Sequence, residues 1–150
     1  MSAAVEDYAT PGPELSPMQR FYSDKSIFLT GATGFMGKVV IEKLLRTCPD
    51  IRAIYVLIRQ KKGNAIQKRF EEVLNDPVFA VLQEKLPKFA DRLIPIAGDI
   101  SQKGLGLKDE DRNTLIQNVE VVFHAAATVR FDEKLRLATA INVQGTKDIL

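Results

Sequence analysis

The sequence predicts an α/β fold with a doubly wound parallel sheet, and three observations lead to this prediction. Short apolar runs rich in β-branched residues alternate with longer segments of helical periodicity. The first of these runs enters a glycine-rich stretch, "TGATGFMGK". Apolar residues make up 45% of the 150 residues, which is enough to build a core. Strands that alternate with helices form βαβ units, and such units build parallel sheets with right-handed crossovers.

The N-terminal stretch differs in composition from the rest. Residues 1–22 are predicted to form a flexible leader, because they hold Pro11, Pro13 and Pro17 and few large apolar side chains. They lack the basic and apolar regions of a secretory signal. The folded part is expected to span residues 23–150, the length of a single domain.

The first half of this domain is predicted to contain two buried strands and one helix. The strands are "SIFLT", residues 26–30, and "AIYVLI", residues 53–58. Between them, residues 35–47 form a predicted helix that ends before Pro49. One face of this helix carries apolar side chains: Val40, Ile41, Leu44 and Leu45.

The second half continues the alternation. A helical region is predicted over residues 65–89, divided by the sequence Asn75-Asp76-Pro77. The elements expected after it are a strand over 92–100, a polar helix over 108–118, a strand over 119–127 and a helix over 133–150. Because no cap or closing turn precedes Leu150, we expect an incomplete sheet of about four strands in a chain that ends inside a helix and continues beyond residue 150.

Three glycines spaced three apart join the first strand to the first helix. This is the context that a dinucleotide-binding fingerprint requires, and it predicts a Rossmann-like fold. Gly31 permits the turn that leaves the strand, Gly34 lets the backbone approach a pyrophosphate, and Gly37 lets the helix pack against the strand. The helix N-terminus offers N–H groups to the phosphates. The hydroxyls of Thr30 and Thr33 can brace the loop or reach a phosphate.

The spacing argues against a nucleoside-triphosphate loop. Such a loop has four residues between its glycines, followed by Lys and Ser or Thr, whereas five residues separate Gly31 from Gly37 and Val39 follows Lys38. Lys38 is therefore predicted to be a surface residue of the helix. A tight turn that holds no ligand is the remaining alternative for the three glycines.

Several segments together resemble one family. The run "TGATGFMGK" is similar to the nucleotide loop of the extended short-chain dehydrogenase/reductase superfamily. With "VLIRQKKG", "AGDIS" and "FHAAATVRFDEKL", residues 18–150 resemble the N-terminal part of the alcohol-forming fatty acyl-CoA reductases. The resemblance implies that NADPH reduces an acyl-CoA thioester through an aldehyde to a primary alcohol. It also implies that Phe35 and Met36, within the loop motif, belong to the cofactor site.

The end of the second strand bears on the choice of cofactor. Arg59 stands where NAD-preferring proteins place an acidic residue, and an Arg instead suits the 2′-phosphate of NADP. No carboxylate occurs from Ile51 to Phe70, and Lys62 adds positive charge. NADPH is therefore the predicted cofactor. The alternative is that Arg59 and Lys62 are solvated basic residues or bind anionic lipid weakly.

Two further segments are predicted to contact the cofactor. In the superfamily, the pair that corresponds to Asp99 and Ile100 borders the adenine ring, and a turn capped by Asp99 is the alternative. Ala125, Ala126 and Ala127 are small enough for the cofactor to lie against their backbone. By resemblance, this alanine segment passes near the nicotinamide-side ribose.

Two polar residues near the last strand are predicted to be structural. His124 is the only histidine, and a lone histidine at a strand end is more typical of a hydrogen-bonded structural residue than of a catalyst. Without nearby Cys or acidic partners it forms no metal site. Asn142, in "NVQGT", resembles an Asn of the superfamily for which a structural role is one interpretation.

The catalytic pair of the superfamily is Tyr-x-x-x-Lys, in which the lysine lowers the pKa of the tyrosine. Tyr8, Tyr22 and Tyr55 are followed four residues later by Gly, Ser and Arg. The pair is therefore expected after Leu150, and this chain alone is predicted to be inactive. Two other functions stay open: another extended reductase or epimerase, and a nucleotide-sensing protein without catalysis.

The predicted partner is a fatty acyl-CoA substrate. The net charge of +2 is too small to indicate nucleic acid, and no run approaches the roughly 18 apolar residues of a membrane helix. The single cysteine, Cys48, excludes an internal disulfide and suits a reducing compartment. We therefore expect an intracellular, cytosol-facing protein, and the resemblance is compatible with association of the whole protein with the endoplasmic reticulum or peroxisome membrane.

Overall fold

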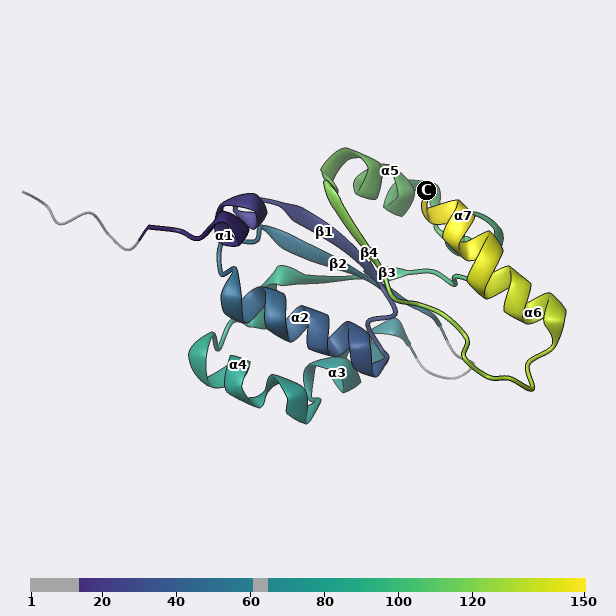
Figure 1. Cartoon of the computed structure of the whole chain (residues 1–150), viewed down its shortest axis with the longest axis horizontal. Coiled ribbons are helices and arrows are strands. Elements are labelled where there is room, and N and C mark those ends of the chain that lie inside the picture. Colours follow the sequence, from purple (N-terminus) through teal and green to yellow (C-terminus); the bar gives the residue numbers. More distant parts are fainter. Residues whose placement is uncertain (1–13, 61–64) are drawn as a thin grey trace, which may run out of the picture.

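The computed structural model describes residues 14–60 and 65–150, which form a four-stranded parallel sheet between two layers of helices (Figure 1). The strand order is β3 (Leu93–Ala97), β2 (Ala53–Ile58), β1 (Ser26–Thr30) and β4 (Val121–His124). This arrangement confirms the predicted α/β class with four strands. Because the chain adds β2 on one side of β1 and β4 on the other, a switch point lies between β1 and β4, where open α/β sheets bind ligands.

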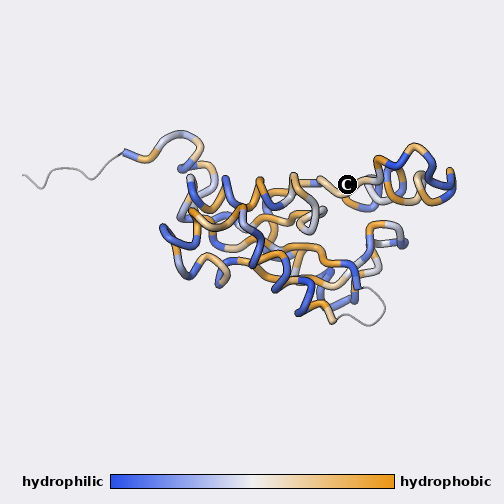
Figure 2. The backbone as a smooth tube through the Cα atoms, turned by 90° about the horizontal axis from the view of Figure 1, so that it is seen from below, coloured by the Kyte–Doolittle hydropathy of each residue, from blue (hydrophilic) through white to orange (hydrophobic). Residues whose placement is uncertain are grey.

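Alternate residues of the strands pack into two cores, one on each face of the sheet. On the first face, α2 (Phe35–Thr47), α3 (Ile66–Leu74) and α4 (Ala80–Lys85) cover strand residues that include Ile27, Leu29, Ile54, Val56 and Ile58. On the second face, α5 (Asp109–Asn118) contributes Leu115 to a smaller core with Phe28, Tyr55, Leu57 and Ile96. Figure 2 shows hydrophobic stretches of the backbone running through the interior of the molecule. Both faces of the inner strands are therefore buried, as parallel sheets require.

The predicted flexible leader is wrong for its last six residues. Residues 17–22 form a helix, α1 (Pro17–Tyr22), and Tyr22 is buried in the first core. Ser16 and Gln19 form a capping box at its start, where a proline is well tolerated. The Gln19 side chain also donates to the carbonyl of Thr47, at 3.0 Å, which ties α1 to the end of α2. Residues 1–13 lie outside the described residues.

The helical region predicted over residues 65–89 is divided where expected. The Asp76 carboxylate accepts the N–H of Val78 at 3.0 Å and starts a short 3-10 turn, η1 (Pro77–Phe79), between α3 and α4. A second such turn, η2 (Phe89–Arg92), leads into β3. The same carboxylate also pairs with Lys38 at 2.5 Å. Lys38 is thus not a free surface residue, because its side chain is only 20% exposed and links α2 to η1.

The last two strands are shorter than predicted. Residues 98–100 and 125–127 leave the sheet after β3 and β4 and form loops at its carboxyl edge. A 3-10 turn, η3 (Lys103–Gly106), follows the first of these loops. The final helical region comprises α6 (Leu135–Thr139), a π-helical segment η4 (Ala140–Gln144) and α7 (Gly145–Ile149). Gly145 allows α7 to approach the first loop, because a Cβ at Gly145 would lie 2.6 Å from Cγ1 of Ile100.

Candidate functional site

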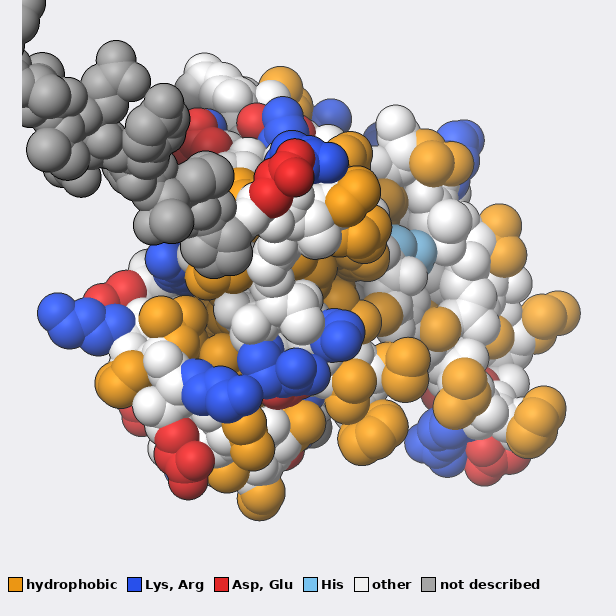
Figure 3. Space-filling model, turned by 60° about the vertical axis from the view of Figure 1, so that its left-hand side comes forward, with side chains coloured by type: hydrophobic (Ala, Val, Ile, Leu, Met, Phe, Trp, Pro, Cys, Tyr) orange, Lys and Arg blue, Asp and Glu red, His pale blue; other side chains and the backbone are white. Residues whose placement is uncertain are grey.

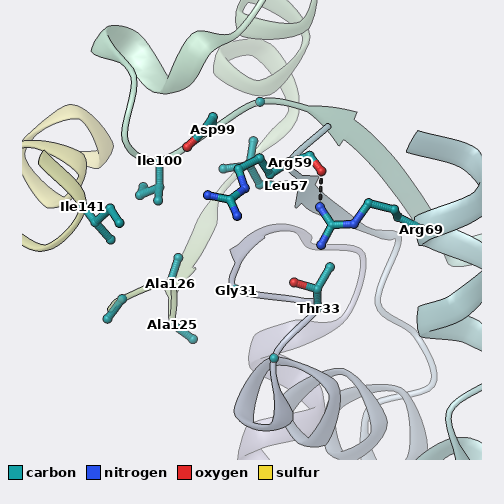
Figure 4. Close-up of a pocket in the computed structure, with 13 residues that line it drawn as sticks. Gly31, Thr33, Leu57, Arg59, Arg69, Asp99, Ile100, Ala125, Ala126 and Ile141 are labelled. Atoms are coloured by element: carbon teal, nitrogen blue, oxygen red, sulfur yellow. Dashed lines mark hydrogen bonds between the residues drawn. The ribbon is translucent and has the colours of Figure 1, made fainter. Parts of the chain in front are cut away.

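A pocket lies at the carboxyl edge of the sheet, at the switch point between β1 and β4 (Figure 4). Each of the four strands contributes the residues that follow or close it. The lining consists of Gly31, Thr33, Gly34, Leu57, Arg59, Arg69, Gly98, Asp99, Ile100, Ala125, Ala126, Ala127 and Ile141. The structure therefore brings together nine of the residues that the sequence predicts for the cofactor, from four separate segments.

The three glycines have different structural roles. Gly31 has φ of +79°, and a Cβ on it would lie 2.7 Å from the carbonyl carbon of Ala125. A Cβ on Gly37 would lie 2.2 Å from the carbonyl oxygen of Gly31. Both positions therefore require glycine for the fold itself. A Cβ on Gly34, by contrast, would meet only the Gly31 oxygen, at 3.3 Å, so the protein alone leaves room there.

The N-terminus of α2 offers a binding site for an anion beside Gly34. Gly34 is the N-cap residue, no side chain caps the helix, and its first turn contains no acidic residue. N–H groups at the start of a helix, together with the helix dipole, attract phosphate. Phe35 and Met36, predicted to belong to the cofactor site, are 77% and 61% exposed and do not line the pocket. An open N-terminus next to an open glycine fits a pyrophosphate.

Two arginines lie on the wall formed by β2 and α3. Arg59 follows β2 and extends into the pocket, and Arg69 of α3 points toward Thr33 of the glycine loop (Figure 4). The Arg69 guanidinium donates to the carbonyl of Arg59, which fixes the two residues relative to each other. Sequence reasoning missed Arg69, because nothing in the local pattern indicates that α3 returns to the end of β2. Lys62, predicted to assist Arg59, lies outside the described residues.

The segment after β3 lines the pocket beside the end of β2. One carboxylate oxygen of Asp99 accepts from the backbone N–H of Ser101 at 2.9 Å and from its hydroxyl at 2.7 Å. The turn considered from the sequence is therefore present. Asp99 and Ile100 nevertheless line the pocket, so the turn and a contact with a ligand are compatible. Gly98, also missed, is packed against Leu57, which a Cβ would meet at 2.5 Å.

Thr30 and His124 lie behind the pocket and do not line it. Thr30 is fully buried, and its hydroxyl lies 2.6 Å from Nδ1 of His124 and accepts the N–H of Ala126 at 3.2 Å. Thr30 was predicted either to brace the loop or to reach a phosphate, and the structure shows that it braces the loop. Burial lowers the pKa of His124 below its ordinary value of 6.5. His124 is hydrogen-bonded on both ring nitrogens, in agreement with a structural residue.

Within residues 14–60 and 65–150, no three His, Cys, Asp or Glu side chains come close enough to hold a metal ion. Among the helices of the same ranges, none is long and apolar enough to cross a membrane. Figure 3 shows basic, acidic and apolar side chains interspersed over one face of the molecule.

The chain is similar to curated fatty acyl-CoA reductases. Fatty acyl-CoA reductase wat of Drosophila melanogaster is 54% identical over 135 residues, which cover 90% of this chain and 26% of that protein. Fatty acyl-CoA reductase 1 of Homo sapiens is 45% identical over 130 residues, which cover 87% of this chain and 25% of that protein. The chain therefore spans about a quarter of the length of the curated relatives it matches.

Solved reductase domains share the fold. The terminal R domain of the myxalamid PKS-NRPS pathway superposes with a TM-score of 0.68 at 32% identity, over 85% of this chain and 31% of that chain. The reductase domain of PhqB from Penicillium fellutanum gives a TM-score of 0.64 at 30% identity, over 87% and 35%. Residues 29–150 match the NAD-binding family described as Male sterility protein. The chain belongs to this family, whose description and reductase neighbours indicate a nicotinamide cofactor.

Proposed function

We propose that this chain is the cofactor-binding part of an NADPH-dependent fatty acyl-CoA reductase that forms primary alcohols. The observation that carries the proposal is the identity of 54% to a fatty acyl-CoA reductase over 90% of the chain. The pocket at the switch point supports it, because the glycine loop, the open α2 N-terminus and two arginines lie around one cavity. The substrate and the product concern the whole protein, of which these residues supply one part.

The two arginines support NADPH over NADH. The ribose 2′-phosphate of NADPH carries a charge that NADH lacks, and Arg groups bind phosphate through parallel N–H donors. Arg59 and Arg69 approach the pocket from two elements, and the part of β2 and its loop that the structure describes carries no carboxylate. An acidic residue for the 2′-hydroxyl of NADH is therefore missing from this wall.

Other residues around the pocket contact the pyrophosphate, the adenine and the nicotinamide-side ribose. The N–H groups at the start of α2 bind the pyrophosphate, with Gly34 leaving space for it. Asp99 and Ile100 border the adenine, and the alanine segment 125–127 accommodates the nicotinamide-side ribose. The bound NADPH supplies hydride, and an alcohol requires two such transfers per acyl-CoA. We propose that a Tyr-x-x-x-Lys pair after Leu150 provides the proton.

The function is tested with the intact protein, a fatty acyl-CoA and NADPH. We expect NADPH oxidation that depends on the acyl-CoA, with a fatty alcohol identified by mass spectrometry. A reaction that stops at the aldehyde would contradict alcohol formation, and the absence of oxidation with acyl-CoA substrates of several chain lengths would contradict the proposed activity. Binding of NADPH without any turnover would instead favour a nucleotide-sensing protein.

The cofactor preference is tested by calorimetric binding of NADPH and NADH. Arg59→Ala and Arg69→Ala should each raise the Kd for NADPH by about tenfold or more, the effect of losing one charge-assisted hydrogen bond, and should change the Kd for NADH far less. Lys43→Ala, on the exposed surface of α2, is the control and should change neither. Equal affinities of the unmodified protein for the two cofactors would refute the assignment of NADPH.

A further inference from the structure

A continuous series of hydrogen bonds runs behind the pocket from β1 to the loop after β4. The Thr30 hydroxyl lies 2.6 Å from Nδ1 of His124, and Nε2 of His124 lies 3.1 Å from the Thr146 hydroxyl on α7. Thr146 in turn donates to the carbonyl of Asn142 at 2.9 Å. The Asn142 side chain then bonds both backbone groups of Thr128, each at 2.9 Å. The series therefore surrounds the alanine segment 125–127.

The donor and the acceptor of each hydrogen bond in this series follow from the Asn142 carbonyl at one end. The carbonyl of Asn142 only accepts, so the single hydroxyl proton of Thr146 is used there, and Thr146 must accept from His124 Nε2–H. A neutral imidazole protonated at Nε2 accepts at Nδ1, so Thr30 donates its hydroxyl proton to Nδ1. The Thr30 oxygen is then free to accept the N–H of Ala126, at 3.2 Å. Every member is satisfied only when His124 is neutral.

Protonation of His124 would break this arrangement. A proton on Nδ1 turns that atom into a donor, and the hydroxyl proton of the fully buried Thr30 would then lose its acceptor. The effect would reach the pocket directly. The backbone of Ala125 and Ala126 is in contact with Gly31, because a Cβ on Gly31 would come within 2.8 Å of both residues. A shift of the alanine segment would therefore move the glycine loop as well.

We propose that His124 is a positioning residue for the cofactor pocket: its neutral imidazole links Thr30 of β1 to Thr146 of α7 and holds residues 125–128 in place. Acid then weakens dinucleotide binding through the protonation of His124. The part of this proposal that concerns the cofactor rests on the proposed function. The part that concerns the hydrogen-bond series stands on the geometry alone.

The surroundings of His124 contain few charges that could act in its place. Neither β1 nor η4 carries a titratable side chain, and β4 carries no other than His124. On α7, Lys147 is exposed, and the carboxylate of Asp148 is bound by the N–H of Gly104 at 2.8 Å and by Gln144 at 2.7 Å. Because burial lowers the pKa of His124, the unfolded chain takes up its proton first, and stability falls as pH drops below 6.5.

NMR of the intact protein with isotope-labelled histidine tests the hydrogen-bond series. The signals of His124 are assigned as those that the His124→Asn substitution removes. We expect the Nε2–H tautomer at neutral pH. The Ala126 amide should be protected from hydrogen exchange, and this protection should fall when His124 is protonated. An Nδ1–H tautomer, an imidazolium at neutral pH, or protection of Ala126 that is independent of pH would overturn the proposal without reference to the cofactor.

Binding measurements test the consequence for the pocket. The amide oxygen of His124→Asn can accept from Thr30 but does not titrate, so the ratio of Kd values at acid and neutral pH should become smaller than in the unmodified protein. Thr146→Val should weaken binding at neutral pH by about fivefold, the effect of one lost hydrogen bond, and Thr146→Ser should restore it. An unchanged acid-to-neutral ratio in His124→Asn, or equal binding by Thr146→Val and Thr146→Ser, would contradict the positioning role. Failure of the unmodified protein to bind any dinucleotide would refute the proposed function instead.

Discussion

Replacing Gly34 with serine is expected to weaken dinucleotide binding while the fold keeps its stability. The backbone of Gly34 is extended, with φ of −87° and ψ of 167°, so any residue can adopt it. The added Cβ would contact only the Gly31 carbonyl oxygen, at 3.3 Å, which a shift of a few tenths of an ångström would relieve. Serine is also among the preferred N-cap residues, and exchanging glycine and serine at an N-cap changes the stability by only a few tenths of a kcal/mol.

The expected loss of binding comes from two effects of the same side chain. The Cβ occupies the space that the pyrophosphate needs, and the serine hydroxyl accepts an N–H of Met36 or Gly37 that would otherwise bind phosphate. A hydrogen bond to a charged group contributes about 1.5–3 kcal/mol. The Kd for NADPH should therefore rise by about tenfold to a hundredfold.

Calorimetric titration with NADPH and denaturant unfolding of the same preparations measure the two effects. Gly34→Ala is the matched variant, because it adds the Cβ without a capping oxygen. It should weaken binding and also lower the free energy of unfolding by about 1 kcal/mol. If Gly34→Ser folds normally and binds NADPH as tightly as the unmodified protein, the pyrophosphate does not lie beside Gly34 and the role of this loop is wrong.

Two further predictions concern the framework of the site. Gly37→Ala should lower the free energy of unfolding by about 1–3 kcal/mol in denaturant titrations, because its Cβ would lie 2.2 Å from the Gly31 oxygen. The clash should outweigh the higher helix propensity of alanine. Unchanged stability would show that the loop can shift. The pKa of Asp76 lies below 3.8 in the folded protein, mainly because Lys38 donates to its carboxylate and also because the Val78 N–H does. The carboxylate should therefore stabilise the fold above pH 3.8, and this stabilisation should be lost as pH falls through the lower pKa of the folded state. Asp76→Asn should reduce this acid dependence in unfolding experiments, and an identical pH profile would contradict it.

Local patterns were sufficient to predict the elements around the glycine loop. The predicted strand over residues 26–30, the helix over 35–47 and the strand over 53–58 have the bounds that the structure shows. Each is a short apolar run or an amphipathic helix whose ends are marked by glycine or by Pro49. The helix α1 was missed although its signal is local. Ser16 followed by Pro17 and then Gln19 is a capping box with proline in the first turn, but the neighbouring prolines favoured the interpretation as a leader.

Contacts that join distant segments could not be predicted from one sequence. Lys38 pairs with Asp76, 38 residues away, and Arg69 lies beside Arg59 because α3 returns across the end of β2. Nothing in the spacing of these residues specifies either contact. The predicted site residues that did meet in one pocket all follow strands, and parallel strands bring their carboxyl ends to the same edge of the sheet.

The orientation of the Gly31 carbonyl group allows the glycine loop to bind an anion. A backbone oxygen that faced the pocket would repel phosphate, whereas the Gly31 carbonyl accepts the N–H of Gly34 at 3.0 Å and is packed against Gly37. The positive φ of Gly31 and the missing Cβ of Gly37 are the conditions for this arrangement. Two of the three glycines therefore place the oxygen inside the loop, and the third leaves the space for the ligand. A dinucleotide then meets N–H groups that are already oriented, so little reorganisation opposes binding.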